Sequence, residues 1–267
     1  MNKIFEIGSN ETANDDARLL LEWSSDHCCY SIIAKESNRV LLLRYYGFDL
    51  TEQEETMMRI AEDLQMLHFS KIVLSPSLST SLLTPSRFAA EAKLSLDGIY
   101  NELNQTYFTD AIDEWQLVNA WSLSTKTYNT LKAALPDANY VHGYTTALKI
   151  YNGFSAEDQV CVHFTPHQFM VLVKKGALLQ LAQTYQYKSP LDVVYYLLKI
   201  CSGLGLQQSE MYLVLSGLIE EDSAMFKELR HYFLNLHFAQ PPLLQLPENE
   251  YPQHYFSSVY NLAACAL

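Results

Sequence analysis

Short hydrophobic segments separated by polar turns occur in two runs of similar length along the chain. In residues 19–75, three segments typical of β-strands precede an amphipathic helical pattern and a fourth strand. The same order of three strands, helix and strand recurs in residues 159–217. Because both runs span about 55 residues, the pattern predicts a duplicated α/β domain.

Each predicted helix of the two runs begins with a recognisable N-terminal signal. Thr51 is followed three positions later by Glu54, so the two side chains can cap each other's backbone amides. In the second run, Ser189 is the expected N-cap, with Pro190 at the first helical position and Asp192 at the third. These signals place a helix directly after the third strand of each run.

The chain between and after the two runs is less regular. We expect a helix through residues 84–103, a strand at 115–121, and helices at 124–136 and 144–151. After the second run, Asp222 is the expected cap of another helix. These elements would complete the two halves of the duplicated domain.

The predicted domains follow from these boundaries. Residues 1–153 form the first lobe, in which the polar residues 1–17 are a loosely ordered lead-in. Residues 154–253 form the second lobe. Residues 254–267 form a terminal helix with almost no charge, which we expect to pack back on the first lobe. The alternative is that this apolar helix covers a partner protein.

The composition is that of an acidic protein with enough apolar side chains for a packed core. Of 267 residues, 49% are hydrophobic and 18% are charged. The formal net charge of -12 opposes binding to a phosphate backbone, so we expect no nucleic-acid partner. Five cysteines without a CxxC motif favour reduced thiols, and no apolar run reaches the roughly 18 residues of a membrane span. We therefore expect a soluble, cytoplasmic protein.

Two groups of reactive side chains suggest other chemistry. One group has the residue types of zinc ligands: Cys161, His163 and His167. No fourth ligand lies nearby, so we expect no metal site. The other group suggests a thiol nucleophile: Asp26, His27, Cys28 and Cys29. Nothing in the sequence supplies an oriented base and an oxyanion hole for it, so we expect no catalytic residue there.

The order of elements resembles the actin-like ATPase fold, a ribonuclease H-like α/β fold found in actin, the sugar kinases and the actin-like proteins of type IV pilus assembly and type II secretion. The chain is also similar to a bacterial family of unknown function that shares this fold. The resemblance covers roughly residues 18–240 and includes the stretch 212–217, Tyr-Leu-Val-Leu-Ser-Gly. It implies two lobes, each with a mixed five-stranded sheet and flanking helices.

The first hairpin departs from the pattern of active relatives. There the turn reads Asp-x-Gly, in which the glycine lets the backbone approach a phosphate and the aspartate holds Mg²⁺ with its waters. In this chain Glu22 stands for the aspartate and Ser24 for the glycine, with the bulky Trp23 between them. The resemblance therefore implies a degenerate phosphate site in the first lobe, where we expect Trp23 to obstruct a phosphate.

The second hairpin and the adenosine loop depart as well. The second turn reads His163, Phe, Thr165 and Pro166; histidine is a poor ligand for a hard cation, and proline removes an amide. The adenosine loop of relatives is a Gly-Gly pair before a helix, and here it is Ser216-Gly217. Six positions thus mark a degenerate nucleotide site: Glu22, Ser24, His163, Thr165, Ser216 and Gly217.

We expect a non-catalytic scaffold or protein-binding adaptor that has given up ATP hydrolysis. We therefore expect no resident cofactor, although ATP with Mg²⁺ is the ligand of the rival hypothesis. In that rival hypothesis, the chain is a nucleotide-binding ATPase or kinase with an altered phosphate site. The chain has 18 tyrosines, and their clusters favour a protein partner because aromatic residues mark interfaces. The pattern does not identify that partner or the oligomeric state.

Overall fold

The computed structural model describes residues 2–9, 17–34, 37–65, 67–77, 80–151, 158–240 and 244–266. The chain divides into two compact units. Unit 1 consists of Met1–Asn152, Leu243–Glu250 and Ser258–Leu267, and unit 2 of Gly153–Pro242 and Tyr251–Ser257. The domain boundary predicted at residue 153 lies outside the described residues.

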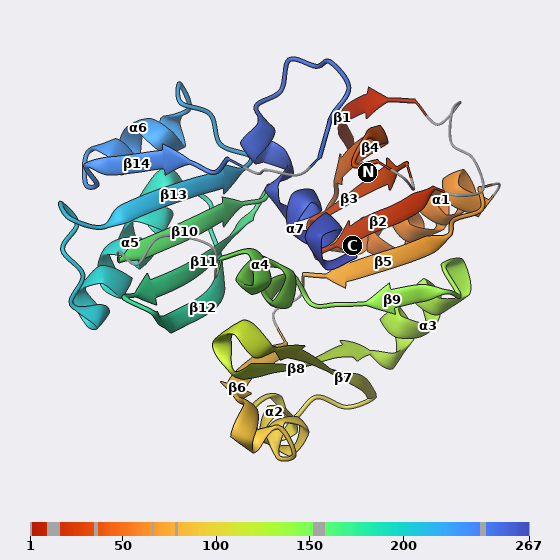
Figure 1. Cartoon of the computed structure of the whole chain (residues 1–267), viewed down its shortest axis with the longest axis horizontal. Coiled ribbons are helices and arrows are strands. Elements are labelled where there is room, and N and C mark those ends of the chain that lie inside the picture. The colour runs from red at the N-terminus through yellow and green to blue at the C-terminus, as the bar shows by residue number, and fades with distance from the viewer. Residues whose placement is uncertain are drawn as a thin grey trace. The chain divides into compact units, whose positions relative to one another are not determined.

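Unit 1 is built on a six-stranded mixed sheet in the order β1-β4-β3-β2-β5-β9 (Figure 1). The elements of this sheet and its first helix are β1 (Asn2–Gly8), β2 (Arg18–Trp23), β3 (His27–Ile33), β4 (Val40–Gly47), α1 (Gln53–Gln65), β5 (Lys71–Pro76) and β9 (Ala138–Tyr140). Strands β2, β3 and β4 are antiparallel, whereas β5 runs parallel to β2 and β9 parallel to β5. The central strands are almost wholly buried, which explains their continuous hydrophobic runs.

Unit 2 is built on a five-stranded mixed sheet in the order β12-β11-β10-β13-β14 (Figure 1). Its elements are β10 (Gln159–Phe164), β11 (Gln168–Lys175), β12 (Leu178–Gln186), α5 (Pro190–Leu204), β13 (Tyr212–Gly217), α6 (Ala224–Arg230) and β14 (Asn235–Phe238). The hairpins β10–β11 and β11–β12 are antiparallel, and β13 and β14 continue the sheet in parallel. A single apolar cluster of buried residues joins the sheet to both helices.

The two sheets share one topology, and their first hairpins and the parallel strands beside them share one register. The order β4-β3-β2-β5-β9 corresponds strand for strand to β12-β11-β10-β13-β14. Arg18 pairs with Lys71 and Gln159 with Tyr212, so parallel partners lie 53 residues apart in both units. Adding 141 to a residue number converts the pairing of β2 with β3 and β5 into that of β10 with β11 and β13, whereas the pairing of the third strand is offset by two residues. The predicted duplicated α/β fold is confirmed.

The N-terminal segment adds a sixth strand that the sequence analysis missed. Asn2–Gly8, predicted as part of a loosely ordered lead-in, forms β1 and pairs antiparallel with β4. Phe5 and Ile7 are buried, so the segment has the period-2 pattern of a strand with one face on a core. Residues 1 and 10–16 of the predicted lead-in lie outside the described residues.

A small antiparallel sheet, β6-β8-β7, is inserted in unit 1 between β5 and β9. Its elements and neighbours are β6 (Ser81–Pro85), η2 (Ser86–Phe88), α2 (Ala92–Tyr100), β7 (Gln105–Ile112), η3 (Asp113–Trp115), β8 (Leu117–Ser124), α3 (Thr125–Ala134) and α4 (Gly143–Tyr151). The single helix predicted through residues 84–103 is wrong, because this stretch holds strand, 3-10 turn and a shorter helix. Strand β7 was not predicted. Phe108 of β7 stacks on Trp121 of β8 at 4.2 Å, which ties the insertion to the core of unit 1.

The helix starts agree only in part with the predicted caps. Ser189 and Asp192 form the predicted capping box of α5. Helix α1 instead follows a 3-10 turn, η1 (Leu50–Glu52), in which the Asp49 amide donates to Glu52 Oε2 at 3.2 Å. The side chain of Glu54, predicted to pair with Thr51, lies outside the described residues. Helix α6 is capped by Ser223, not Asp222, because the Phe226 amide donates to Ser223 Oγ at 3.1 Å.

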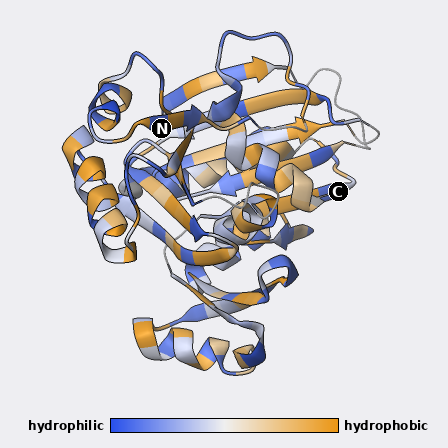
Figure 2. Cartoon of the chain, turned by 60° about the vertical axis from the view of Figure 1, so that its left-hand side comes forward, coloured by the Kyte–Doolittle hydropathy of each residue, from blue (hydrophilic) through white to orange (hydrophobic). Residues whose placement is uncertain are grey.

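The C-terminal segment is two elements, not one helix. A 3-10 turn, η4 (Gln253–Phe256), belongs to unit 2, and most of α7 (Ser257–Ala266) belongs to unit 1. Val259 and Leu262 of α7 are each 1% exposed, so these side chains are not available to a partner. Hydrophobic residues concentrate in the strands of both sheets, while the connecting loops are mainly hydrophilic (Figure 2). Among the helices that the structure describes, none has the length and hydrophobicity to cross a membrane.

Candidate functional site

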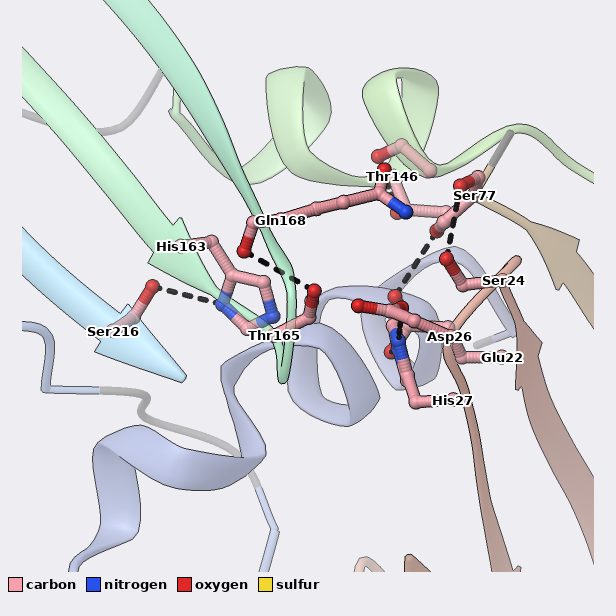
Figure 3. Close-up of polar contacts among 11 residues, drawn as sticks. Glu22, Ser24, Asp26, His27, Ser77, Thr146, His163, Thr165, Gln168 and Ser216 are labelled. Carbon is pink, nitrogen blue, oxygen red and sulfur yellow. Dashed lines mark hydrogen bonds and ion pairs between the residues drawn. The ribbon is translucent and has the colours of Figure 1, made fainter. Parts of the chain in front are cut away.

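The turn between β2 and β3 holds the first two predicted site residues. The Ser24 amide donates to the His27 carbonyl at 2.9 Å, which closes the hairpin, and Ser24 Oγ donates to the Ser77 carbonyl at 3.4 Å. Glu22 precedes the turn, and its Oε1 accepts from Ser77 Oγ at 3.0 Å (Figure 3). The Ser24 amide is therefore used inside the hairpin and is not directed at a ligand.

A buried cluster of two carboxylates and one imidazole surrounds Glu22. His27 Nδ1 lies 2.7 Å from Asp26 Oδ1, and His27 Nε2 lies 3.6 Å from Glu22 Oε2 (Figure 3). The side chains of Glu22, Asp26 and His27 are at most 8% exposed. The imidazole also stacks on Tyr45 at 5.2 Å with nearly parallel rings. His27 is thus held between two acids in a region with little solvent.

The surroundings of His27 favour its charged form. Burial alone would lower the pKa of the imidazole, but the hydrogen bond that Asp26 accepts and the negative charges of Glu22 and Asp26 outweigh it. Together they raise the pKa of His27 from its ordinary value of 6.5 to about 9. At neutral pH the cluster therefore holds a cation between two carboxylates, and His27 is the counter-charge of Glu22.

The neighbouring cysteines are not suited to nucleophilic chemistry. Cys28 and Cys29 are buried, and burial together with the charge of Glu22 raises the pKa of both thiols well above its usual range. A thiol that stays protonated is a weak nucleophile. All five cysteines lie in described parts of the chain, and none forms a disulfide.

Trp23 does not occupy the turn, so the expectation that its bulk obstructs a phosphate there is wrong. The indole is 1% exposed, lies in the core of unit 1 and packs 5.3 Å from Phe48. Beside it is a cavity of about 40 Å³, lined also by Gln53 and Met57 of α1 and by Thr127, Thr130 and Leu131 of α3. At about 30 Å³ for each water, this cavity is much too small for a nucleotide.

The equivalent turn in unit 2 has the same backbone and no carboxylate. The Thr165 amide donates to the Gln168 carbonyl at 2.9 Å, as Ser24 does to His27, and Thr165 Oγ1 donates to the same carbonyl. His163, the counterpart of Glu22, is hydrogen-bonded through Nδ1 to Ser216 Oγ at 3.0 Å (Figure 3). This turn also uses its own amide internally, and its first polar side chain is a histidine where the resemblance expects an aspartate.

The backbone conformation at position 217 requires glycine, independently of any role in ligand binding. Gly217 has a φ of +77°, and a Cβ at this position would lie 2.1 Å from the Phe164 carbonyl oxygen. The next amide, that of Leu218, donates to the same carbonyl at 2.9 Å. The glycine therefore allows β13 to leave the sheet against β10, which is sufficient reason for a glycine here.

The segment that follows Gly217 is covered by the chain itself. His254 and Tyr255 of η4 pack against it: His254 Nε2 lies 2.7 Å from the Ile219 carbonyl oxygen, and the Tyr255 hydroxyl donates to Glu220. The His254 ring stacks on Phe238 at 4.2 Å, and both η4 side chains are buried. An aromatic residue of the chain thus fills the place next to the predicted adenosine loop.

No described group of three or more histidine, cysteine, aspartate or glutamate side chains is arranged to hold a metal ion. This holds for the zinc candidates Cys161, His163 and His167. At Glu22, a divalent cation would be placed next to a protonated His27, and the two like charges would repel. The residues at the first turn therefore do not fit a Mg²⁺ site while His27 is charged.

Sequence reasoning placed the two turns correctly and missed the side chains that complete them. His27 and Asp26 were considered only as partners of the cysteines. The signal was present, because a tight hairpin after Glu22 and Trp23 brings the first residue of the return strand back beside Glu22. Neither His254 nor Tyr255 could be assigned to this region from sequence, since they lie far along the chain from Gly217.

Known structures identify the fold. A protein from Bacteroides thetaiotaomicron with an actin-like ATPase fold and unknown function aligns with a TM-score of 0.76 and 15% identity, over 93% of this chain and 96% of that one. A chain of the PilM–PilN type IV pilus biogenesis complex aligns with a TM-score of 0.62 and 10% identity, over 93% and 98%. The ethanolamine utilization protein EutJ from Carboxydothermus hydrogenoformans aligns at 0.51 and 8%, over 96% and 93%.

These similarities confirm the predicted actin-like ATPase fold, and at such identities they show the fold alone. No curated protein gives a significant match. The sequence model of one protein family, however, matches residues 9–236, which is most of the chain. The chain therefore belongs to the family described as "Protein of unknown function (DUF3822)".

Proposed function

We propose that this protein is a non-catalytic scaffold or protein-binding adaptor with an actin-like fold and a degenerate nucleotide site. The observation that carries the proposal is His27 between Glu22 and Asp26. In an active site of this fold the acid before the turn would face Mg²⁺, whereas here it faces a cationic side chain of its own chain. A buried carboxylate that is already neutralised gains little from a metal ion.

Three further observations support the loss of nucleotide binding. The Ser24 and Thr165 amides close their own hairpins, His163 bonds Ser216, and the segment after Gly217 is covered by His254 and Tyr255. Each of the six predicted site positions thus has a role in holding the fold together. A protein that keeps this architecture without the phosphate and metal contacts is most simply kept for its surface.

The structural relatives favour a protein partner. The second of the similar structures described above is a complex of two proteins, PilM and PilN. By fold analogy, we infer that this chain also acts by binding another protein. Its overall charge of -12 leaves much of its surface suited to partners with basic patches.

The rival function is a nucleotide-binding ATPase or kinase with an altered phosphate site. It draws on the retained Ser216-Gly217 pair at the end of β13. Titration calorimetry with ATP and Mg²⁺ separates the two. A dissociation constant below about 100 µM, equivalent to roughly 5.5 kcal/mol, that is lost in Glu22→Ala would establish the rival. We expect no measurable heat and no ATP hydrolysis or sugar phosphorylation.

A variant tests whether His27 is the reason that Glu22 does not bind Mg²⁺. His27→Gln removes the cation beside Glu22 and keeps a side chain of similar size that can hydrogen-bond. If His27 is what excludes the metal ion, this variant gains weak Mg²⁺ affinity that the native protein lacks. His167→Gln, in the corresponding turn of unit 2, is the matched control and should gain none. Equal Mg²⁺ affinity in all three proteins would contradict the role given to His27.

A further inference from the structure

Strand β12 is an edge strand without the usual protection. It forms one end of the unit 2 sheet, and its nine residues, LLQLAQTYQ, include no charge, proline or glycine. Proteins usually protect edge strands with charges, proline or short length, because an edge is a template for another strand. The other described sheet ends follow that rule: β1 contains Lys3 and Glu6, β6 ends in a proline, β7 contains Asp110, and β9 and β14 have three and four residues.

The register shows which β12 amides face outward. The Tyr187 amide donates to the His167 carbonyl at 3.1 Å, so at this position the backbone faces β11. Because hydrogen-bonding direction alternates along a strand, the backbone groups of Gln186 and Ala182 point away from β11. The bulge between β11 and β12 lies further along, near Leu179, and leaves this stretch regular. At Gln186 and Ala182 an incoming strand would find outward-facing N–H and C=O groups.

An apolar and aromatic surface continues from this edge onto α5. Tyr185 of β12 stacks on Tyr196 of α5 at 4.4 Å, and Tyr195 packs on Tyr196 at 5.4 Å. Leu191, one helical turn before Tyr195, is 59% exposed and Tyr195 is 58% exposed. Side chains of a strand added to β12 that point to this face would lie against the tyrosines. Exposed tyrosines with one packed face are typical of interface hot spots.

The charge around the edge has the opposite sign to that of the whole chain. Residues 168–204 contain four lysines, of which Lys174 is buried, and one aspartate, a formal charge of +3 within a chain of -12; Asp158 adds one negative charge at the β11–β12 turn, where it accepts from the Gly176 amide. Lys175, Lys188 and Lys199 are exposed, and the aspartate, Asp192, is engaged at the start of α5. A second copy of this chain that paired edge to edge would bring two positive patches together. The surface is complementary to an acidic strand.

We propose that β12 receives an extended, acidic segment of a partner protein as an additional strand of the unit 2 sheet. The segment contributes backbone hydrogen bonds to β12, apolar side chains to the surface of Tyr185, Tyr195 and Leu191, and carboxylates to the lysines. This inference rests on the proposed adaptor function, for which it names the binding surface and the chemistry of the partner.

The test uses the full chain and two labelled ten-residue peptides, one alternating valine with glutamate and one alternating valine with lysine. Fluorescence anisotropy in 150 mM salt should show the glutamate peptide binding at least tenfold more tightly than the lysine peptide. Amide hydrogen exchange should slow in β12 when the glutamate peptide is bound. Ala182→Pro removes an outward N–H and should weaken binding at least tenfold, whereas Ala182→Thr keeps the N–H and should change it less than twofold.

A second set of variants tests the role of the lysines and does not require Ala182→Pro to fold. Lys188→Glu with Lys199→Glu should weaken the glutamate peptide at least tenfold, and Lys227→Glu on α6, which precedes the opposite edge strand, should not. Absence of binding by the glutamate peptide at 1 mM, or protection of amides elsewhere, overturns the proposal. A dimer of the native protein that Ala182→Pro dissociates also overturns it, in favour of a second copy.

The same variants separate this proposal from the adaptor function itself. If proteins that co-purify with the native chain are retained equally by Ala182→Pro and by the double lysine variant, the adaptor function stands and the β12 site is wrong. If the native chain binds ATP with Mg²⁺ in calorimetry, the adaptor function fails whatever the peptides do.

Discussion

The hairpin between β2 and β3 holds two carboxylates around a histidine, whereas the hairpin between β10 and β11 has hydrogen bonds and no carboxylate. Their backbones correspond position for position: Trp23 pairs with Cys28, and 141 residues later Phe164 pairs with Phe169. In both turns the amide after the strand donates to the carbonyl three residues on, at 2.9 Å. Yet the polar residue before the turn is Glu22 in one and His163 in the other.

This difference shows which features the fold itself requires. Backbone pairing and the closing hydrogen bond of each turn survive with any side chains that permit them. The polar side chains at the strand ends are less constrained, and in each unit they contact side chains of the same unit. Unit 1 balances Glu22 with His27, and unit 2 pairs His163 with Ser216. The stability of the two units should therefore respond very differently to equivalent changes.

The largest expected effect is that of His27→Ala in unit 1. Removing the imidazole leaves Glu22 and Asp26 buried without their cation, and loss of one partner from a buried ionic group destabilises by about 3–5 kcal/mol. Urea unfolding followed by tryptophan fluorescence measures it cleanly, because Trp23, Trp115 and Trp121 all belong to unit 1. In unit 2, His163→Ala at the counterpart of Glu22 removes the hydrogen bond to Ser216, worth about 1 kcal/mol.

The measurement for unit 2 is far-UV circular dichroism at the same urea concentrations. Equal losses of stability in the two variants would mean that His27 is not the buried cation of the cluster. In that case, the contrast between the hairpins would lie in side-chain identity alone and not in electrostatics.

The second effect is a pH dependence confined to unit 1. The pKa of His27 in the folded state, about 9, lies above its ordinary value of 6.5, so protonation favours folding. The stabilisation is complete below pH 6.5 and is lost as the pH rises through about 9. At 1.36 kcal/mol per unit, the loss is roughly 3 kcal/mol. Tryptophan-detected unfolding between pH 6.5 and 10 should show it in the native protein, and His27→Gln should abolish it.

Local pattern was enough to predict most of the fold. The two runs of strands and the capped helix α5 were correct because each depends on neighbouring residues, such as Ser189 and Asp192. Strand β1 was missed because the polar residues around it masked the alternation of Phe5 and Ile7, and its partner β4 is distant in sequence. Because β1 was missed, we expected a five-stranded sheet in unit 1, whereas the structure has a six-stranded one.

The site was harder to predict than the fold. The ends of the strands could be located from the element order, and the structure has Glu22, Ser24, His163 and Ser216 at or next to the strand ends where we predicted them. The direction in which each side chain points could not be predicted from the element order. Trp23 was expected at the turn and lies in the core, because it takes the inward side of the strand. The tight hairpin indicates that His27 returns beside Glu22, but the sequence does not show that their side chains face each other in the core.

A third effect compares two glycines of unit 2. Gly217→Ala forces an alanine to a φ of +77° with its Cβ against the Phe164 carbonyl, and the strained backbone alone should destabilise by about 1–3 kcal/mol. Gly203→Ala, in α5 with open space around it, should stabilise by about 0.5–1 kcal/mol. The counterpart of Gly217 in unit 1 is Pro76, so the two units leave the sheet differently here. If Gly217→Ala leaves the free energy of unfolding unchanged, the backbone of this turn can adjust to alanine, and the glycine has another role.

The smallest effect concerns the helices that follow the third strand of each unit. Helix α5 begins with a full capping box, in which the Ser189 side chain accepts from the helix and Asp192 accepts from the Ser189 amide at 2.9 Å. Ser189→Ala should therefore lower the stability of unit 2 by about 1 kcal/mol. Helix α1 follows a 3-10 turn that contains the Asp49–Glu52 contact, and Glu52→Ala should lower the stability of unit 1 by about half as much or less. Urea titrations read by circular dichroism for the first variant and by tryptophan fluorescence for the second give both values. If Glu52→Ala instead costs more stability than Ser189→Ala, the contact in the 3-10 turn stabilises α1 more than the capping box stabilises α5.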